Sequence, residues 1–234
     1  MSLDHLLHTL WRDWPWWLAG ELIGLSLVPL ARVIPCAVLQ RAQAPLHEWQ
    51  GPGGGLDRPV PIARYAWVLV VNTGLWIDAA RVASHPAWAA PLLWGIVASS
   101  LLLLALIDWD TTLLPDWIVL PLGVAGLASS HAGFTQHSLF ASAASAAAVL
   151  GLFGGLDLVF RRVRGKSGVG GGDLKLLAAL ATWWGVVDVL YVVSLASLGT
   201  VVWNLAWRRF KGLGSDAEWP FGPAILAAAL LWGV

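Results

Sequence analysis

The sequence of 234 residues is poor in charge and almost free of cysteine. Charged residues make up 12% of the chain, with 14 Lys and Arg balanced by 14 Asp and Glu, whereas a soluble domain carries about 25%. So few charges cannot cover a water-soluble globule or attract nucleic acid electrostatically, and the apolar excess excludes disorder. One cysteine, Cys36, excludes an intramolecular disulfide and a tetracysteine zinc site.

A basic segment ahead of the first apolar stretch is also missing. Asp4 and Asp13 stand where a signal peptide would be basic. We therefore expect no cleavable signal at the N-terminus.

Long apolar stretches dominate what is present. Hydrophobic residues make up 58% of the chain, and its 17 Trp suit a membrane–water interface. The apolar stretches are 14–31, 65–80, 88–107, 117–134, 138–156, 176–207 and 221–234. The stretch 176–207 is too long for one span, so we expect a break near Gly185–Asp188. The pattern predicts an all-α polytopic membrane helix bundle with about eight transmembrane helices.

The distribution of basic residues predicts the orientation. With the N-terminus outside, all of the 14 Lys and Arg except Arg12 and Arg81 fall on the cytoplasmic side. Cys36–Arg64, which contains glycines and several prolines, is predicted to be an irregular cytoplasmic loop.

Carboxylates at membrane depth are costly, and they are usually functional or paired. The candidates are Glu21, Asp78, Asp108, Asp110, Asp116, Asp157, Asp173 and Asp188. For Glu21, Asp78 and Asp188 we expect an interfacial or bundle-facing carboxylate without a special role. Asp157 precedes Arg161 by one helical turn, which favours a local ion pair.

Three of these carboxylates cluster at one predicted cytoplasmic turn. Asp108, Asp110 and Asp116 lie between the third and fourth spans, where Pro115 breaks the helix. Asp116 is interpreted as the N-cap of the fourth span and Asp110 as a solvated loop residue.

Asp173 opens the sixth predicted span, directly after a glycine-rich segment that contains Gly170 and Gly172. Glycines permit close backbone approach and positive φ, so this carboxylate can enter the bundle. The segment is not a phosphate-binding loop, because it lacks the Gly-Lys-Ser/Thr ending and no strand precedes it.

Two carboxylates at the cytoplasmic edge of a bundle suggest an aspartic-protease dyad. Like charges held close share a proton and titrate as a unit. One carboxylate then acts as a base on water, while the other, protonated, polarises the scissile carbonyl.

These segments resemble the type IV prepilin peptidases, which are membrane aspartic proteases of the Gly-x-Gly-Asp type. The resemblance covers about residues 60 to 234. It rests on Asp108 with Leu114-Pro115-Asp116, on Arg164-Gly165-Lys166 followed by Gly170-Gly171-Gly172-Asp173-Leu174-Lys175, on Pro220-Phe221-Gly222-Pro223 and on Arg64-Tyr65.

The resemblance implies that Asp108 and Asp173 are the catalytic pair, supported by Gly170, Gly172, Lys175, Asp116 and Pro115. It implies a multi-pass enzyme of the bacterial inner membrane. Such an enzyme removes the leader from type IV prepilins or type II secretion pseudopilins and cuts after a glycine. Lys175 is expected to bias the charge of the pair, to meet the substrate, or simply to extend its ammonium group to the interface.

The chain also departs from the family. Many members N-methylate the new N-terminus with S-adenosylmethionine and carry a longer loop with two zinc-binding Cys-x-x-Cys pairs. Here the loop is short, Cys36 is alone, and Ser167 replaces a common Glu. We expect residues 1–65 to be a degenerate methyltransferase-like region without zinc and residues 66–234 to be the peptidase domain. Proteolysis is expected to need no cofactor, and S-adenosylmethionine only if methylation is retained.

Two other functions fit the same composition. A transporter also uses intramembrane carboxylates, but it more often shows inverted repeats, and we find no repeat in this sequence. An inactive membrane scaffold of a pilus or secretion system is the second alternative. Retention of both aspartates and of the glycines argues against the scaffold.

Overall fold

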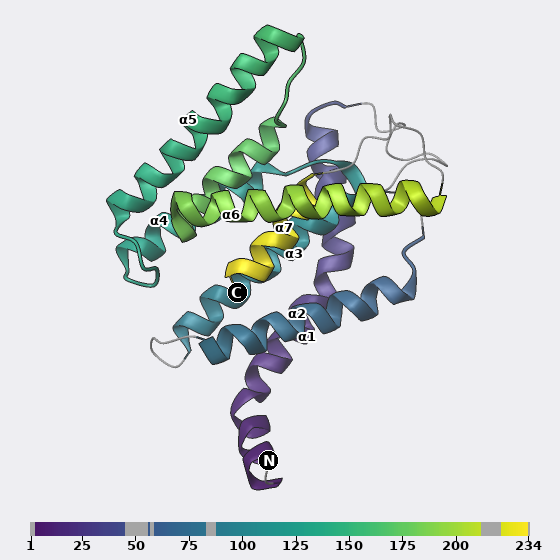
Figure 1. Ribbon diagram of the computed structural model, residues 1–234. Coiled ribbons are helices and arrows are strands. Elements are labelled where there is room, and N and C mark those ends of the chain that lie inside the picture. The colour runs from purple at the N-terminus through teal and green to yellow at the C-terminus, as the bar shows by residue number, and fades with distance from the viewer. Residues whose placement is uncertain (1–2, 45–55, 57–58, 83–87, 212–220, 234) are drawn as a thin grey trace. The chain divides into compact units, whose positions relative to one another are not determined.

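A computed structural model describes residues 3–44, 56, 59–82, 88–211 and 221–233, and the elements formed there are helices (Figure 1). The predicted all-α class is confirmed for this part of the chain. The chain divides into two compact units, residues 1–111 and 112–233, each of which is described by itself.

The first unit contains α1 (Leu3–Arg41), α2 (Ile62–Val82) and α3 (Ala89–Thr111), and each helix packs against the other two. α3 is apolar on almost all sides, as is typical of a helix surrounded by other helices or by lipid. Its residues Leu101, Leu104 and Ile107 have no exposed surface.

A chain of polar contacts crosses the centre of this unit. The Asn72 amide donates to the Gly20 carbonyl at 2.7 Å, the Ser99 hydroxyl donates to Asn72 Oδ1 at 2.8 Å, and Trp76 Nε1 donates to Ser99 Oγ at 2.9 Å. Asn72 and Trp76 are fully buried. Buried polar groups need hydrogen-bond partners, and these bonds supply them. They also connect all three helices of the unit, through Gly20 of α1, Asn72 of α2 and Ser99 of α3.

The second unit contains α4 (Asp116–His131), α5 (Leu139–Arg164), α6 (Gly171–Lys211) and α7 (Gly222–Gly233). α6 packs against the other three helices. Ser138 caps α5 by accepting from the Ala141 amide at 3.2 Å, and Gly165 ends it at a φ of 71°. Only glycine adopts that left-handed conformation without strain.

α6 consists of two helices joined at Gly185, whose φ of 83° and ψ of 171° leave the helical region. Figure 1 shows α6 changing direction along its length. The break predicted near Gly185–Asp188 is therefore confirmed. The imidazole Nε2 of His137 lies 2.9 Å from the Trp184 carbonyl oxygen, at hydrogen-bond distance.

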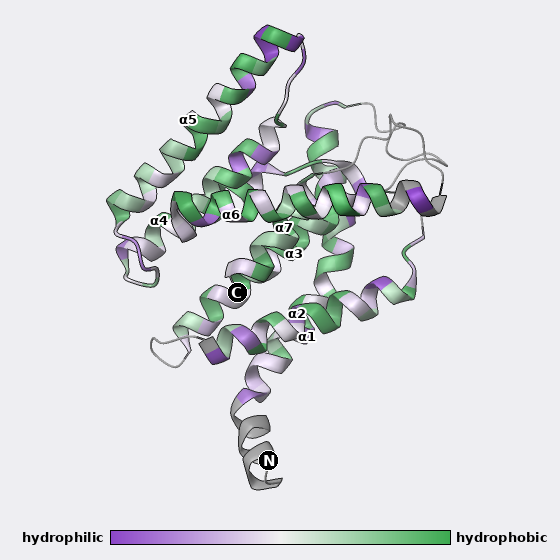
Figure 2. Ribbon diagram, viewed as in Figure 1, coloured by the Kyte–Doolittle hydropathy of each residue, from purple (hydrophilic) through white to green (hydrophobic). Residues whose placement is uncertain are grey.

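Among the residues that the structure describes, four helices are long and apolar enough to cross a membrane: Asp13–Arg41, Ala89–Thr111, Leu139–Arg164 and Gly171–Ala206. In Figure 2, α5 is hydrophobic along most of its length and hydrophilic at its C-terminal end, which carries Arg161, Arg162 and Arg164. These helices indicate an integral membrane protein.

Both bounds predicted for the loop Cys36–Arg64 are wrong, because α1 continues to Arg41 and α2 already begins at Ile62. The apolar run after Cys36 extends the helix, and Leu39 within it is buried. Residues 45–55, 57–58 and Pro220 lie outside the described residues. The functional division at residue 65 stays a prediction.

Gly95 provides the first testable prediction, because a Cβ built there would lie 2.6–2.8 Å from ring atoms of the buried Trp76. We expect Gly95→Ala to lower the free energy of unfolding by about 1–3 kcal/mol through overpacking. Gly74→Ala is the matched control: no atom lies within 4 Å of its Cβ position, and alanine favours a helix. Thermal unfolding in one detergent compares them, and equal stability of the two variants would contradict the role of overpacking.

Candidate active site

Asp108 lies in the last turn of α3, in the first unit, and is 4% exposed. The sequence placed it in the segment after the third span, whereas α3 continues to Thr111 and includes it. A carboxyl group so enclosed, at the end of an apolar helix, has the setting expected of a functional acid.

Asp110, two residues further along α3, contacts two arginines. Its Oδ1 accepts from Arg64 Nη1 at 2.8 Å, and its Oδ2 lies 3.5 Å from Arg32 Nε. The three side chains are 8%, 12% and 17% exposed respectively. The prediction that Asp110 is a solvated loop residue is therefore wrong, because α3 continues past it and arginines from α1 and α2 lie at the same end.

Arg64 also bonds to the backbone of α3. Its Nη2 donates to the Leu106 carbonyl oxygen at 3.3 Å. Together with the Asp110 contacts, this bond fastens the end of α3 that carries Asp108 to the start of α2 and to α1. The sequence analysis places Arg64 at the end of the predicted cytoplasmic loop and in the Arg64-Tyr65 motif, and it does not predict the partner of this side chain.

Asp173 lies in the first turn of α6, in the second unit, and is half-buried. A Cβ built on Gly172 would lie 3.1 Å from Leu114 Cβ, so glycine permits the predicted close approach. A Cβ on Gly170 would lie 3.0 Å from Asp173 Oδ2. The predicted positive φ is not found at these glycines in the described part of the chain; it is found earlier, at Gly165.

Asp116 and Lys175 form an exposed bridge between α4 and α6. Lys175 Nζ donates to both oxygens of Asp116, at 2.9 and 2.8 Å. The N-cap residue of α4 is Pro115, and Asp116 is the first helical residue, without a capping bond. The predicted N-cap at Asp116 is therefore wrong: its carboxylate binds the ammonium group of Lys175.

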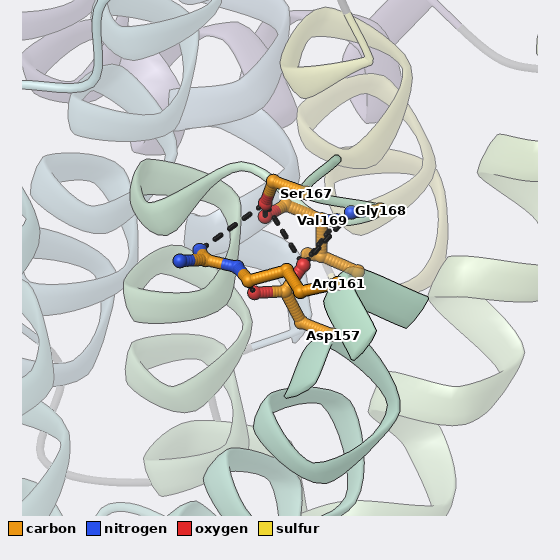
Figure 3. A network of polar contacts seen from close by, with 5 residues as sticks. All are labelled: Asp157, Arg161, Ser167, Gly168 and Val169. Atoms are coloured by element: carbon orange, nitrogen blue, oxygen red, sulfur yellow. Dashed lines mark hydrogen bonds and ion pairs between the residues drawn. The ribbon is translucent and has the colours of Figure 1, made fainter. Parts of the chain in front are cut away.

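Asp157, near the end of α5, organises the loop that precedes α6 (Figure 3). Its Oδ2 lies 2.6 Å from Arg161 Nε, which confirms the predicted ion pair. Its Oδ1 accepts three further bonds, from Ser167 Oγ at 2.8 Å, from the Gly168 amide at 2.8 Å and from the Val169 amide at 3.2 Å. These loop bonds were not predicted, because no periodic pattern connects the loop with the helix.

The other candidate carboxylates in the described part of the chain differ in exposure. Glu21 and Asp78 are exposed and Asp188 is half-buried. Asp13, which was not predicted to be paired, is 2% exposed and lies 3.3 Å from Arg81 Nη2. Within the described residues no group of three or more His, Cys, Asp or Glu side chains is arranged to hold a metal ion.

The structure thus gathers the predicted residues into two sets. Asp108 and Asp110 lie with Arg32 and Arg64 in the first unit. The set in the second unit comprises Pro115, Asp116, Asp157, Gly170, Gly172, Asp173 and Lys175. Each set contains one of the two aspartates predicted as the catalytic pair, Asp108 or Asp173, in a terminal helical turn next to an ion pair.

Comparison with known proteins gives a family match. A family model described as the Type IV leader peptidase family matches residues 95–205, a segment that contains Asp108 and Asp173. No solved structure matches the chain.

Several curated relatives carry the name prepilin leader peptidase/N-methyltransferase. One from Pseudomonas aeruginosa is 40% identical over 151 residues, which is 61% of this chain and 48% of the relative. One from Stutzerimonas stutzeri is 38% identical over 149 residues, again 61% and 48%. One from Aeromonas hydrophila is 34% identical over 199 residues, or 81% and 66%. The chain therefore spans about half the length of the first two relatives and about two thirds of the third.

Asp110→Ala tests how much the contacts of Asp110 with Arg32 and Arg64 contribute to stability. The substitution leaves two enclosed guanidinium groups without their carboxylate, so we expect it to lower the free energy of unfolding by about 3–5 kcal/mol. Asp116→Ala removes the same side chain from an exposed pair and should cost less than about 1 kcal/mol. Unfolding of both variants in the same detergent measures the difference, and similar losses would show that the arginines do not depend on Asp110.

Proposed function

Since residues 95–205 belong to the type IV leader peptidase family, we propose that this protein is an intramembrane aspartic endopeptidase. Its proposed reaction removes the leader peptide from type IV prepilins or type II secretion pseudopilins, cutting after a glycine. The observation that carries the proposal is that the family segment contains two aspartates at helix ends: buried Asp108 in the last turn of α3 and half-buried Asp173 in the first turn of α6.

In the proposed mechanism Asp108 and Asp173 share one proton. The ionised carboxylate removes a proton from water, and the resulting hydroxide attacks the carbonyl carbon of the scissile peptide. The protonated carboxyl group donates a hydrogen bond to the carbonyl oxygen. The other aspartate, which took the proton from water, then passes it to the leaving amine as the C–N bond breaks. The chain supplies every group that this route requires, without a metal or a covalent intermediate.

The proposed orientation has the N-terminus outside and both aspartates at the cytoplasmic ends of about eight spans in the bacterial inner membrane. Contacts within the first unit support it. In the first unit, Arg32 of α1 and Arg64 of α2 both meet Asp110 of α3, while Asp13 and Arg81 pair near the opposite ends of α1 and α2. This is the alternation that three successive spans require.

A substrate of this class suits such a position. A prepilin leader is basic and precedes an apolar helix, and a site at the membrane edge can receive that helix laterally. The lipid bilayer is then the medium through which enzyme and substrate meet.

The relatives' names include a second activity, N-methyltransferase, which we consider separately from cleavage. Cys36 is the only cysteine and lies within α1, so it supplies one thiolate where a paired Cys-x-x-Cys site needs four. The described residues show no cluster that we assign to S-adenosylmethionine, and we derive no methyl-transfer step. We propose cleavage without methylation.

Replacing either aspartate tests the proposed peptidase. We expect Asp108→Asn and Asp173→Asn each to abolish cleavage, because neither amide can share the proton, while both variants still insert and fold. Asp78→Asn, at an exposed carboxylate, is the matched control and should cut normally. The readout is the intact mass of a co-expressed prepilin whose basic leader ends in glycine. Full processing by either dyad variant would exclude this mechanism.

The same mass measurement tests methylation when this protein is the only candidate processing enzyme in the cell. We expect a mature pilin with a free N-terminus. A product heavier by one methyl group would refute the proposed loss of methyltransferase activity. An uncut prepilin would instead favour the inactive scaffold.

A further inference from the structure

We propose that Asp157 is a positioning residue for Asp173, acting through the loop that connects α5 to α6. The inference rests on the proposed peptidase function, since it assigns Asp173 a catalytic role. Asp157 itself is placed in contact with the loop and with Arg161, not with substrate.

One oxygen of Asp157 gathers its donors from a single loop, as Figure 3 shows. Oδ1 accepts from the Ser167 hydroxyl and from the two successive backbone amides of Gly168 and Val169, at 2.8, 2.8 and 3.2 Å. Hydrogen bonds to an ionised carboxylate are stronger than bonds between neutral groups. One buried side chain therefore fixes three consecutive residues of the loop.

Three glycines separate this fixed segment from Asp173. Gly170, Gly171 and Gly172 lie between Val169 and Asp173, and a Cβ on Gly171 would meet no atom within 4 Å. Glycine has the largest backbone freedom, so this run cannot fix the start of α6 through its own side chains. Gly171 and Gly172 are the first residues of α6, and the Leu174 amide donates to the Gly170 carbonyl oxygen at 3.0 Å. Contacts on both sides of the run add to these backbone bonds. Asp157 holds the preceding residues, and the Asp116–Lys175 bridge holds the first turn of α6.

The loop bonds of Asp157 are separable from its ion pair. Arg161 is 57% exposed and lies one turn away on the same helix, so its pair with Asp157 needs no loop. Arg161 Nη2 also donates to Ser167 Oγ at 3.2 Å, and this bond is likewise exposed. Arg161 neutralises the charge of Asp157, while the loop amides depend on an oxygen acceptor at position 157.

The experiment compares Asp157→Ala, Asp157→Asn and Arg161→Gln with the wild-type protein in detergent. Cleavage of the prepilin described above gives kcat and KM, and amide hydrogen exchange reports residues 166–173. In Asp157→Ala the loop amides lose their acceptor, so exchange in that segment should accelerate. We expect kcat to fall about 10–100-fold at unchanged KM, because small misplacement of a reacting group costs about that much.

Two variants distinguish positioning from general destabilisation. Asp157→Asn keeps an acceptor oxygen and should restore most of kcat and most of the exchange protection. Arg161→Gln keeps the carboxylate and its loop bonds, so it should have nearly wild-type kcat. Asp78→Asn reports the effect of losing a carboxylate elsewhere.

Three results would overturn the inference while the wild-type protein is active. They are an unchanged kcat in Asp157→Ala, exchange at 166–173 that stays slow in that variant, and equal losses of kcat in Asp157→Asn and Asp157→Ala. A wild-type protein that leaves the prepilin uncut would count against the proposed function itself. In that case Asp157 would have no role in catalysis either. Amide hydrogen exchange at residues 166–173 would still show whether Asp157 orders the loop.

Discussion

A carboxylate enclosed by apolar helices is stable only if a cation or several hydrogen-bond donors match it, and the described structure follows this constraint in both units. Asp110 meets two arginines, and Asp157 meets an arginine, a hydroxyl and two amides. Asp110 follows Asp108 by two residues on α3, and Asp157 bonds to the loop that leads to Asp173, the second aspartate proposed for catalysis. Ion pairs and hydrogen bonds therefore hold the helix ends and the loop next to the two aspartates that we propose as catalytic.

The sequence predicted what depends on local pattern. Apolar runs gave the helices, and the length of one run predicted the break found at Gly185. The pair of Asp157 with Arg161 followed from helical periodicity, because four residues make about one turn. Predicted topology placed Asp108 and Asp173 at the cytoplasmic edge with two other carboxylates, and the family resemblance then singled out these two; both lie in terminal turns.

Contacts between distant segments were beyond that reasoning. Asp110 and Arg64 are 46 residues apart, and nothing in the pattern of either helix states which partner the carboxylate meets. Asp116 satisfied the sequence preference for an N-cap, yet Lys175 of another helix competes for its oxygens. Ser167 was noted only as a departure from the family, although its hydroxyl bonds to Asp157. In each case tertiary packing selected one of several locally acceptable arrangements.

The buried bonds from Gly20 through Asn72 and Ser99 to Trp76 have a consequence for sliding between helices. Apolar side chains tolerate exchange of neighbours of similar size, so hydrophobic contact alone opposes axial slippage only weakly. The polar series is directional, since each donor faces one acceptor on the adjacent helix. A shift of α1 by one turn, about 5.4 Å, would move the Gly20 carbonyl oxygen away from the Asn72 amide. The amide would then be buried without a hydrogen-bond acceptor, which costs free energy. These few hydrogen bonds therefore fix the axial register of the helices in the first unit. The apolar contacts hold the helices together but do not select one register.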